Sequence, residues 1–200
     1  LELKRLIERA LRRAGLPLRY SEGYNPEPRI SYSSPIPLGI ESTAEIMDVD
    51  LLESINAREL LEKANREMPE GVVLYSARLI SPKTASIAAS VEKIKWRIDL
   101  SRTGRGFSRE ESSRRIGAFL ARSDIPFTKE RKGKTRKVNM RGFVDSIELR
   151  EDGRIDLTMN VIRELQVRAA QVAKELFDLS DDEVRRLRIK KTRNIFKEHV

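Results

Sequence analysis

One proline-rich segment combines a rigid backbone with side chains of the types that can bind ligands. Five of the eight prolines stand between residues 17 and 37, and proline restricts the backbone because its ring fixes φ. A rigid loop with aromatic and polar side chains suits recognition, since it loses little entropy on binding. We expect a tyrosine here to stack on a base and an arginine to contact phosphate. The alternative is a connection that only crosses the end of a sheet. The candidate residues are Tyr20, Glu22, Gly23, Tyr24, Asn25, Pro26, Pro28 and Arg29.

Two acids follow on a predicted strand over residues 43–51. Asp48 and Asp50 are two positions apart, so both side chains point to one face of the strand. Such a pair suits a hard cation or acid–base chemistry. Alternating acids are also common on a solvated strand, and we favour that interpretation. Asp48 is kept as a candidate beside the loop.

The second part of the chain carries a strongly basic segment. The net charge is +9, and all of the positive excess lies after residue 80. Such an asymmetry favours a polyanionic partner, nucleic acid above all, although a solvated basic surface is the alternative. Seven basic residues and one acid lie between Lys129 and Arg141, on a predicted hairpin that would follow a phosphate backbone. The predicted nucleic-acid-binding residues are Lys129, Arg131, Lys132, Lys134, Arg136, Lys137, Arg141, Lys191 and Arg193.

Enzyme chemistry has little support in the sequence. The chain has no cysteine, and its one histidine is His199, which argues against thiolate or histidine metal sites and against a Ser-His-Asp triad. Neither Gly-rich phosphate-binding motif is present. We therefore expect no metal and no cofactor, and a non-catalytic protein. The chain also has no apolar run long enough to span a bilayer, and we predict a cytoplasmic protein that does not contact membranes.

The hydrophobic periodicity predicts an α+β protein with two domains, residues 1–85 and 86–200, joined at a Ser- and Ala-rich stretch near 81–90. In each domain the order of elements suits a ferredoxin-like split βαβ fold, so we expect two such domains in tandem. The chain begins at Leu1 within helical periodicity, and we expect the first strand to precede it. The predicted helices cover 1–14, 56–67, 108–120 and 162–177. The predicted strands cover 29–33, 43–51, 72–80, 94–100 and 187–196, with hairpins turning at 132–134 and 151–153.

Four stretches in the first domain carry a family resemblance. They are Ile7-Glu8-Arg9-Ala10-Leu11-Arg12-Arg13-Ala14-Gly15-Leu16-Pro17, Tyr20-Ser21-Glu22-Gly23-Tyr24-Asn25-Pro26-Glu27-Pro28-Arg29-Ile30, Pro35-Ile36-Pro37-Leu38-Gly39 and Ala44-Glu45-Ile46-Met47-Asp48-Val49-Asp50-Leu51. In kind and order they resemble the radical-SAM-linked proteins, a bacterial family of unknown function. Weaker similarity follows at Val138-Asn139-Met140-Arg141 and at Lys191-Thr192-Arg193.

The resemblance implies a partner, a cobalamin-type radical SAM enzyme, and a setting in RNA processing or modification. The combined expectation is a non-catalytic module that binds RNA or delivers a substrate to that enzyme. Two alternatives stay open at this point. One is an enzyme of unknown reaction with a pocket near Glu22 and Asp48, and the other is an adaptor that docks the radical SAM protein.

Overall fold

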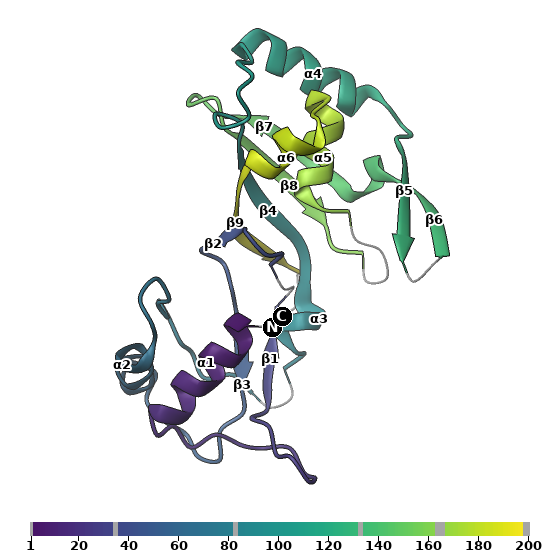
Figure 1. Cartoon of the computed structure of the whole chain (residues 1–200). Coiled ribbons are helices and arrows are strands. Elements are labelled where there is room, and N and C mark those ends of the chain that lie inside the picture. Colours follow the sequence, from purple (N-terminus) through teal and green to yellow (C-terminus); the bar gives the residue numbers. More distant parts are fainter. Residues whose placement is uncertain (1, 34–35, 82–83, 132–133, 163–166, 198–200) are drawn as a thin grey trace. The chain divides into compact units, whose positions relative to one another are not determined.

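Figure 1 shows the computed structural model of the chain, which describes residues 2–33, 36–81, 84–131, 134–162 and 167–197. It divides into two compact units, Leu1–Ser33 with Ile46–Ala89 and Ser34–Glu45 with Ser90–Val200. Helices and strands occur in both units, so the predicted α+β class is confirmed. Residues 34–45, which lie within the predicted span 1–85, belong to the second unit. Among the described residues, no helix is both long and apolar enough to cross a membrane.

The first unit is built on two long helices, a one-turn helix and a short antiparallel pair of strands. Its elements are α1 (Glu2–Arg13), β1 (Ile30–Tyr32), β3 (Met47–Val49), α2 (Ala57–Glu67) and α3 (Ile87–Ser90). β1 pairs with β3 so that Ile30 lies opposite Val49. Helix α1 forms because its apolar residues recur at helical spacing, and its buried Ile7 and Leu11 pack with Ala64 of α2. The predicted helix 1–14 is thereby confirmed.

The strand predicted at 72–80 is wrong. Residues 72–81 carry the alternating pattern, yet their backbone forms no strand. The side chain of Asn65 on α2 explains part of this: its Oδ1 accepts a hydrogen bond from Leu74 N at 2.8 Å, and its Nδ2 donates one to Leu74 O at 2.9 Å. One side chain thus takes the place of a partner strand at that position. The described part of this unit contains a two-stranded sheet, and a ferredoxin-like first domain stays a prediction.

The second unit is a five-stranded sheet with helices and a hairpin. Its sheet has the order β2-β9-β4-β8-β7, and β5 pairs with β6 in a separate hairpin. The elements are β2 (Glu41–Ser42), β4 (Val91–Asp99), α4 (Arg109–Ala121), β5 (Pro126–Arg131), β6 (Lys134–Asn139), the 3-10 helix η1 (Met140–Phe143), β7 (Val144–Leu149), β8 (Ile155–Asn160), α5 (Ala169–Phe177), α6 (Asp181–Arg186) and β9 (Arg188–Phe196).

Most local predictions for this unit are confirmed. In the β7–β8 hairpin Ile147 lies opposite Leu157, and Leu149 lies opposite Ile155. The helix predicted at 162–177 begins later, at Ala169. Residues 161–162 and 167–168 are not helical, and the N-cap residue Arg168 donates its backbone N–H to Gln171 Oε1 at 2.8 Å across the first turn. Helical periodicity alone does not show where the first turn starts, whereas the cap does.

The two faces of the sheet differ in chemistry because strand residues alternate between them. Helices α4 and α5 cover one face, where Trp96 and Leu157 join the main apolar core with Phe119 and Phe177. The other face is charged. At its centre Asp156 is buried, with 2% exposed, among cations. Arg97 donates two hydrogen bonds to its carboxylate, at 2.8 and 3.1 Å.

Two further cations complete this cluster. Arg150 Nη1 lies 3.2 Å and Lys95 Nζ lies 3.4 Å from Oδ2 of Asp156. Burial by itself raises the pKa of Asp156, but the hydrogen bonds and charges of Arg97, Lys95 and Arg150 outweigh it and hold that pKa below its usual value. The carboxylate is therefore ionised in the folded protein and joins β4 to β8.

We expect Asp156→Asn to lower the free energy of unfolding by about 3 kcal/mol at neutral pH, because it removes one partner of a buried charge cluster. Since the folded pKa of Asp156 lies below its unfolded value, its stabilisation is present above about pH 4 and is lost as the pH falls through the folded pKa. Urea unfolding at several pH values measures this directly.

The deficit of the variant should shrink as the pH falls below about 4. Asp145→Asn serves as the control, because Asp145 pairs with Lys93 on the surface, where its side chain is 35% exposed. That change should cost less than about 1 kcal/mol. A deficit for Asp156→Asn that is equal at neutral and acid pH would rule out the charge cluster as its cause.

Candidate nucleic-acid interface

Three backbone segments meet at the base of the proline-rich loop. Arg19 N donates to Asp50 O at 2.9 Å, Asp50 N donates to Arg29 O at 3.0 Å, and Arg29 N donates to Arg19 O at 2.8 Å. The side chains of Arg29 and Asp50 form an ion pair at 3.2 Å beside this base, with 56% and 47% of them exposed. An ion pair this exposed contributes little stability, so the guanidinium of Arg29 remains accessible to an anion.

The tip of the loop presents one fully exposed aromatic ring. Ser21 closes the loop, because its backbone N donates to Glu27 O at 2.8 Å and its Oγ accepts from Glu27 N at 3.0 Å. Gly23 has φ +128°, which residues with a Cβ rarely adopt. Tyr24 is fully exposed, while Tyr20 lies under the guanidinium of Arg12 at 5.6 Å. Of the remaining candidates, Glu22, Asn25 and Pro26 are exposed and Pro28 is buried.

The two acids of the predicted pair each have a partner within the protein. Asp48 Oδ2 accepts a hydrogen bond from Ile87 N at 2.7 Å, at the first residue of α3. Asp50 pairs with Arg29, as described above. Asp48 thus holds a neighbouring segment of the chain.

The basic hairpin β5–β6 brings its cations together in pairs. Lys129 lies opposite Arg136, and Arg131 lies opposite Lys134. Arg136 and Lys137 are exposed. Lys132 lies outside the described residues, as do the side chains of Lys129, Arg131 and Lys134. The root of the hairpin is rigid, because Asn139 Oδ1 accepts from Ile125 N and Arg141 N, at 3.0 and 2.9 Å.

Two predicted nucleic-acid ligands have structural roles instead. Arg141 is half-buried, and its Nη1 donates to Val144 O at 2.6 Å. The prediction that Lys191 binds nucleic acid is wrong, because its side chain is 0% exposed and its Nζ lies 2.9 Å from Glu45 Oε1. A lysine without solvent contact does not reach a phosphate. A count of basic residues in the sequence cannot reveal this burial, because the count does not show which side chains of a strand are covered by other parts of the chain.

Residues 36–45 cover Lys191, and we call them the edge strap. Within the strap, β2 pairs in parallel with β9, and Thr43 N donates to Lys191 O at 3.0 Å. Asn194 Nδ2 donates to Ala44 O, and Ser42 Oγ donates to Glu45 at 2.8 Å. Burial lowers the pKa of Lys191, while the charge and hydrogen bond of Glu45 act against that shift. The strap therefore depends on an ion pair that is closed to water on the lysine side.

Most cations on the charged face of the sheet are already neutralised. Lys93 pairs with Asp145 at 2.7 Å, Lys95 with Glu148 at 3.3 Å, and Arg97 with Asp156 at 2.8 Å. These side chains add little to the attraction of a polyanion, because each positive charge has its own carboxylate. Counting basic residues overestimates the positive potential of this face.

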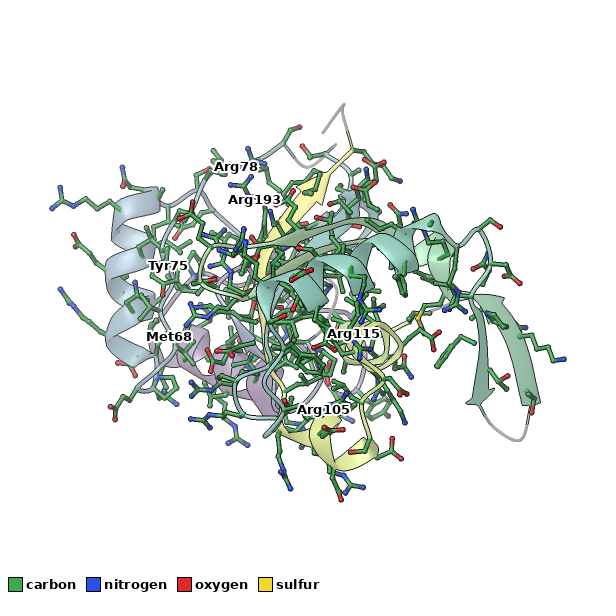
Figure 2. All side chains as sticks on the ribbon, turned by 90° about the horizontal axis from the view of Figure 1, so that it is seen from above. Met68, Tyr75, Arg78, Arg105, Arg115 and Arg193 are labelled. Carbon is green, nitrogen blue, oxygen red and sulfur yellow. The ribbon has the colours of Figure 1, made fainter. Side chains whose placement is uncertain are left out.

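Unneutralised cations gather instead along the junction of α6 and β9. Arg186, Arg188, Lys190 and Arg193 form no ion pair with any described residue, and we call these four residues the basic track. A register shift in the β4–β9 ladder decides which of these side chains point to the same face of the sheet. Lys190 lies opposite Arg97, and because of the shift Arg193 takes the place opposite Lys95 that Thr192 would otherwise have. Lys190 and Arg193 therefore share one face. Figure 2 shows Arg193 on the yellow strand β9.

A family model matches most of the chain. Residues 1–174 match the model of a family described as "Uncharacterized protein conserved in bacteria (DUF2344)". No curated protein matches the sequence. The prediction of a bacterial family of unknown function is confirmed by the family match. Its association with a radical SAM enzyme stays a prediction.

We expect Glu45→Gln to destabilise the protein by about 3 kcal/mol, because it removes the carboxylate that faces a buried ammonium group. Lys191→Met should cost less, since Glu45 is 33% exposed and its charge keeps contact with water. Chemical unfolding measures both losses. Amide hydrogen exchange should rise in the edge strap for Glu45→Gln, whereas equal losses in the two variants would contradict this account.

Proposed function

The chain belongs to the DUF2344 family of bacterial proteins, and on that premise we propose that it is a non-catalytic module that binds RNA. The observation that carries the proposal is the basic track, where four cations without an ion pair to any described residue lie on one short stretch of α6 and β9. Cations in a row along an extended strand suit a phosphate backbone, which attracts them without regard to sequence.

The loop in the first unit supplies a second kind of contact. The basic track gives affinity but no selectivity, because phosphates are the same at every nucleotide. The fully exposed ring of Tyr24 at the loop tip suits stacking on an unpaired base. Arg29 stands at the base of the same loop with an exposed guanidinium. We infer that single-stranded RNA, whose bases are accessible, is the class of nucleic acid bound.

The arrangement of the second unit supports the proposal by analogy. Its elements run β4-α4-β7-β8-α5-β9, and the corresponding strands lie in the order β9-β4-β8-β7. This is the order of a ferredoxin-like split βαβ domain, with the hairpin β5–β6 inserted before β7 and β2 added at one edge. We propose that assignment for the second unit alone. Such domains recur among RNA-binding proteins, although a fold does not by itself define a function.

A docking role for a protein partner is the second candidate, and one segment favours it. The irregular stretch after α2 exposes three large apolar side chains, Val73, Tyr75 and Leu79. Tyr75 is labelled in Figure 2. Exposed apolar side chains on a chain with unpaired backbone groups favour protein contact. The radical SAM enzyme implied by the family resemblance is the partner to test, by pull-down with the purified intact chain.

We expect the double variant Lys190→Gln, Arg193→Gln to bind a single-stranded oligoribonucleotide more weakly and with a shallower dependence on salt. Each lost phosphate contact should reduce the slope of log K against log salt by about 0.7. Fluorescence anisotropy across a salt series measures both quantities. The matched control is Arg58→Gln, Lys63→Gln on α2, whose side chains pair with Glu62 and Glu59, and it should bind as the intact protein does. Equal effects of the two double variants would exclude the basic track as an RNA-binding surface.

We expect Tyr24→Ala to weaken the same binding by about 1–3 kcal/mol, the contribution of stacking one base. The salt slope should stay unchanged, because stacking releases no counterions. Tyr24→Phe retains the ring and should bind normally. An unchanged affinity in Tyr24→Ala would remove the loop from the interface.

A further inference from the structure

A cleft of about 440 Å³ opens in the second unit at one end of the basic track. Its walls come from the edge strap, from the turn that follows β4, and from the junction of α6 with β9. The side chains that matter are Glu41, Arg102, Arg185, Arg186 and Arg188, with the buried Ile189 beside them. A volume of this size lies in the range of small-molecule sites, roughly 300–1,000 Å³.

The charge in the cleft is unbalanced toward positive. Arg185 is committed to Asp182, with Nη1 and Oδ1 separated by 2.6 Å. Arg102, Arg186 and Arg188 have no ion pair with any described residue. Glu41 is the one acid among the residues that line the cleft. Three free guanidinium groups thus face one carboxylate, which leaves the cleft attractive to an anion.

The arginines that line the cleft come from different elements. Gly104, in the turn after β4, has φ +84°, and a Cβ at this position would lie 3.9 Å from Nη1 of Arg186. The guanidinium of Arg186 therefore lies against the turn that carries Arg102. Arg188 comes from the first residue of β9. All three arginines line the same cleft, so an anion bound in it would lie close to their positive charges.

A separate arginine holds the walls in place. Arg105 Nη1 donates to Asp178 O at 2.9 Å, and its Nε lies 3.6 Å from Glu183 Oε1 on α6. Its guanidinium also lies over the ring of Phe107 at 4.9 Å. Figure 2 shows Arg105 beside the short yellow helix α6. Thr103, buried in the same turn, donates to Leu100 O at 2.8 Å.

The start of α6 is fixed by its own cap as well. Ser180 and Glu183 form a capping box, in which Ser180 N donates to Glu183 Oε2 at 2.7 Å. Glu183 is thus shared between the cap and Arg105, and its pKa is lowered first by the hydrogen bonds from Ser180. These contacts hold the turn after β4 and the start of α6 in place, so a bound anion would order mainly the exposed arginine side chains.

We propose that this cleft binds the phosphate group of a single nucleotide, either a free nucleoside phosphate or the 5′-phosphorylated end of an RNA. Guanidinium groups bind phosphate oxygens in a bidentate fork, which favours a terminal phosphate with several free oxygens over a diester. The carboxylate of Glu41 is an acceptor for a sugar hydroxyl. The proposal deepens the RNA-binding function proposed above, because it makes the cleft the place where the RNA chain begins.

The experiment compares two oligoribonucleotides of one sequence, with a 5′-phosphate and with a 5′-hydroxyl group, and adds ADP as a free nucleotide. The cleft variant is Arg102→Gln, Arg186→Gln. The track variant Lys190→Gln, Arg193→Gln removes the same charge outside the cleft and is the matched control. Calorimetric titration at fixed salt measures each affinity, and the melting temperature shows that each variant is folded.

We expect the intact protein to prefer the 5′-phosphate by about tenfold or more, the effect of one charge-assisted hydrogen bond. The cleft variant should lose this preference and the track variant should keep it. Arg186→Lys, which retains the charge without the fork, should give an intermediate preference. ADP binding that is lost in the cleft variant identifies a free nucleotide as a ligand.

Each failure has a separate meaning. Tight RNA binding without any end preference and without ADP binding would overturn the cleft and leave the RNA function intact. ADP binding without RNA binding would leave the cleft and overturn the RNA function. An end preference that persists in the cleft variant would overturn the proposal even if both ligands bind.

Discussion

The ladder between β4 and β9 is the interaction on which the second unit depends. It joins residues 91–99 to residues 188–196 in antiparallel register, so the last strand of the chain lies inside the sheet and has a neighbour on each side. On one side β4 connects β9 to β8 and the apolar core. On the other side the edge strap covers β9, because β2 pairs with it in parallel. An edge that is covered is also protected from pairing with other chains.

The placement of β9 explains why its basic residues have different roles. Lys191 faces the strap and is buried against Glu45, whereas the basic track faces outward. The register shift beside Trp96 changes which later residues share a face with Lys190. Adjacent residues of one basic sequence thus divide between a structural ion pair and a surface for anions. The physical reason is that side chains alternate between the two faces of a strand, and that the register shift interrupts this alternation once in β9.

Electrostatics in this unit follows from pairing more than from composition. The charged face of the sheet is rich in lysine and arginine, but Asp145, Glu148 and Asp156 neutralise its centre. Cations without an ion pair to any described residue lie instead at the end of α6, along β9 and in the turn after β4. This distribution produces a cationic cleft next to a cationic strand, and it gives the proposed RNA interface a local site in addition to a diffuse attraction.

What the sequence by itself determined is local. The alternation of Lys93, Ile94, Lys95 and Trp96 predicts β4, the apolar spacing of α1 predicts that helix, and the Glu151-Asp152-Gly153 turn predicts the β7–β8 register, because each depends on neighbours along the chain. The rigid loop around Tyr24 was also predictable from its prolines and Gly23, although its ability to bind a base stays a prediction.

Only the tertiary structure decided which charges are free. The burial of Lys191 against Glu45 and the position of Arg186 beside Gly104 depend on residues far apart in sequence. The failed strand at 72–80 has the same cause, since strand formation needs a partner strand, and Asn65 takes that place at Leu74. A side chain's type is local information, but its partner and its exposure are properties of the fold.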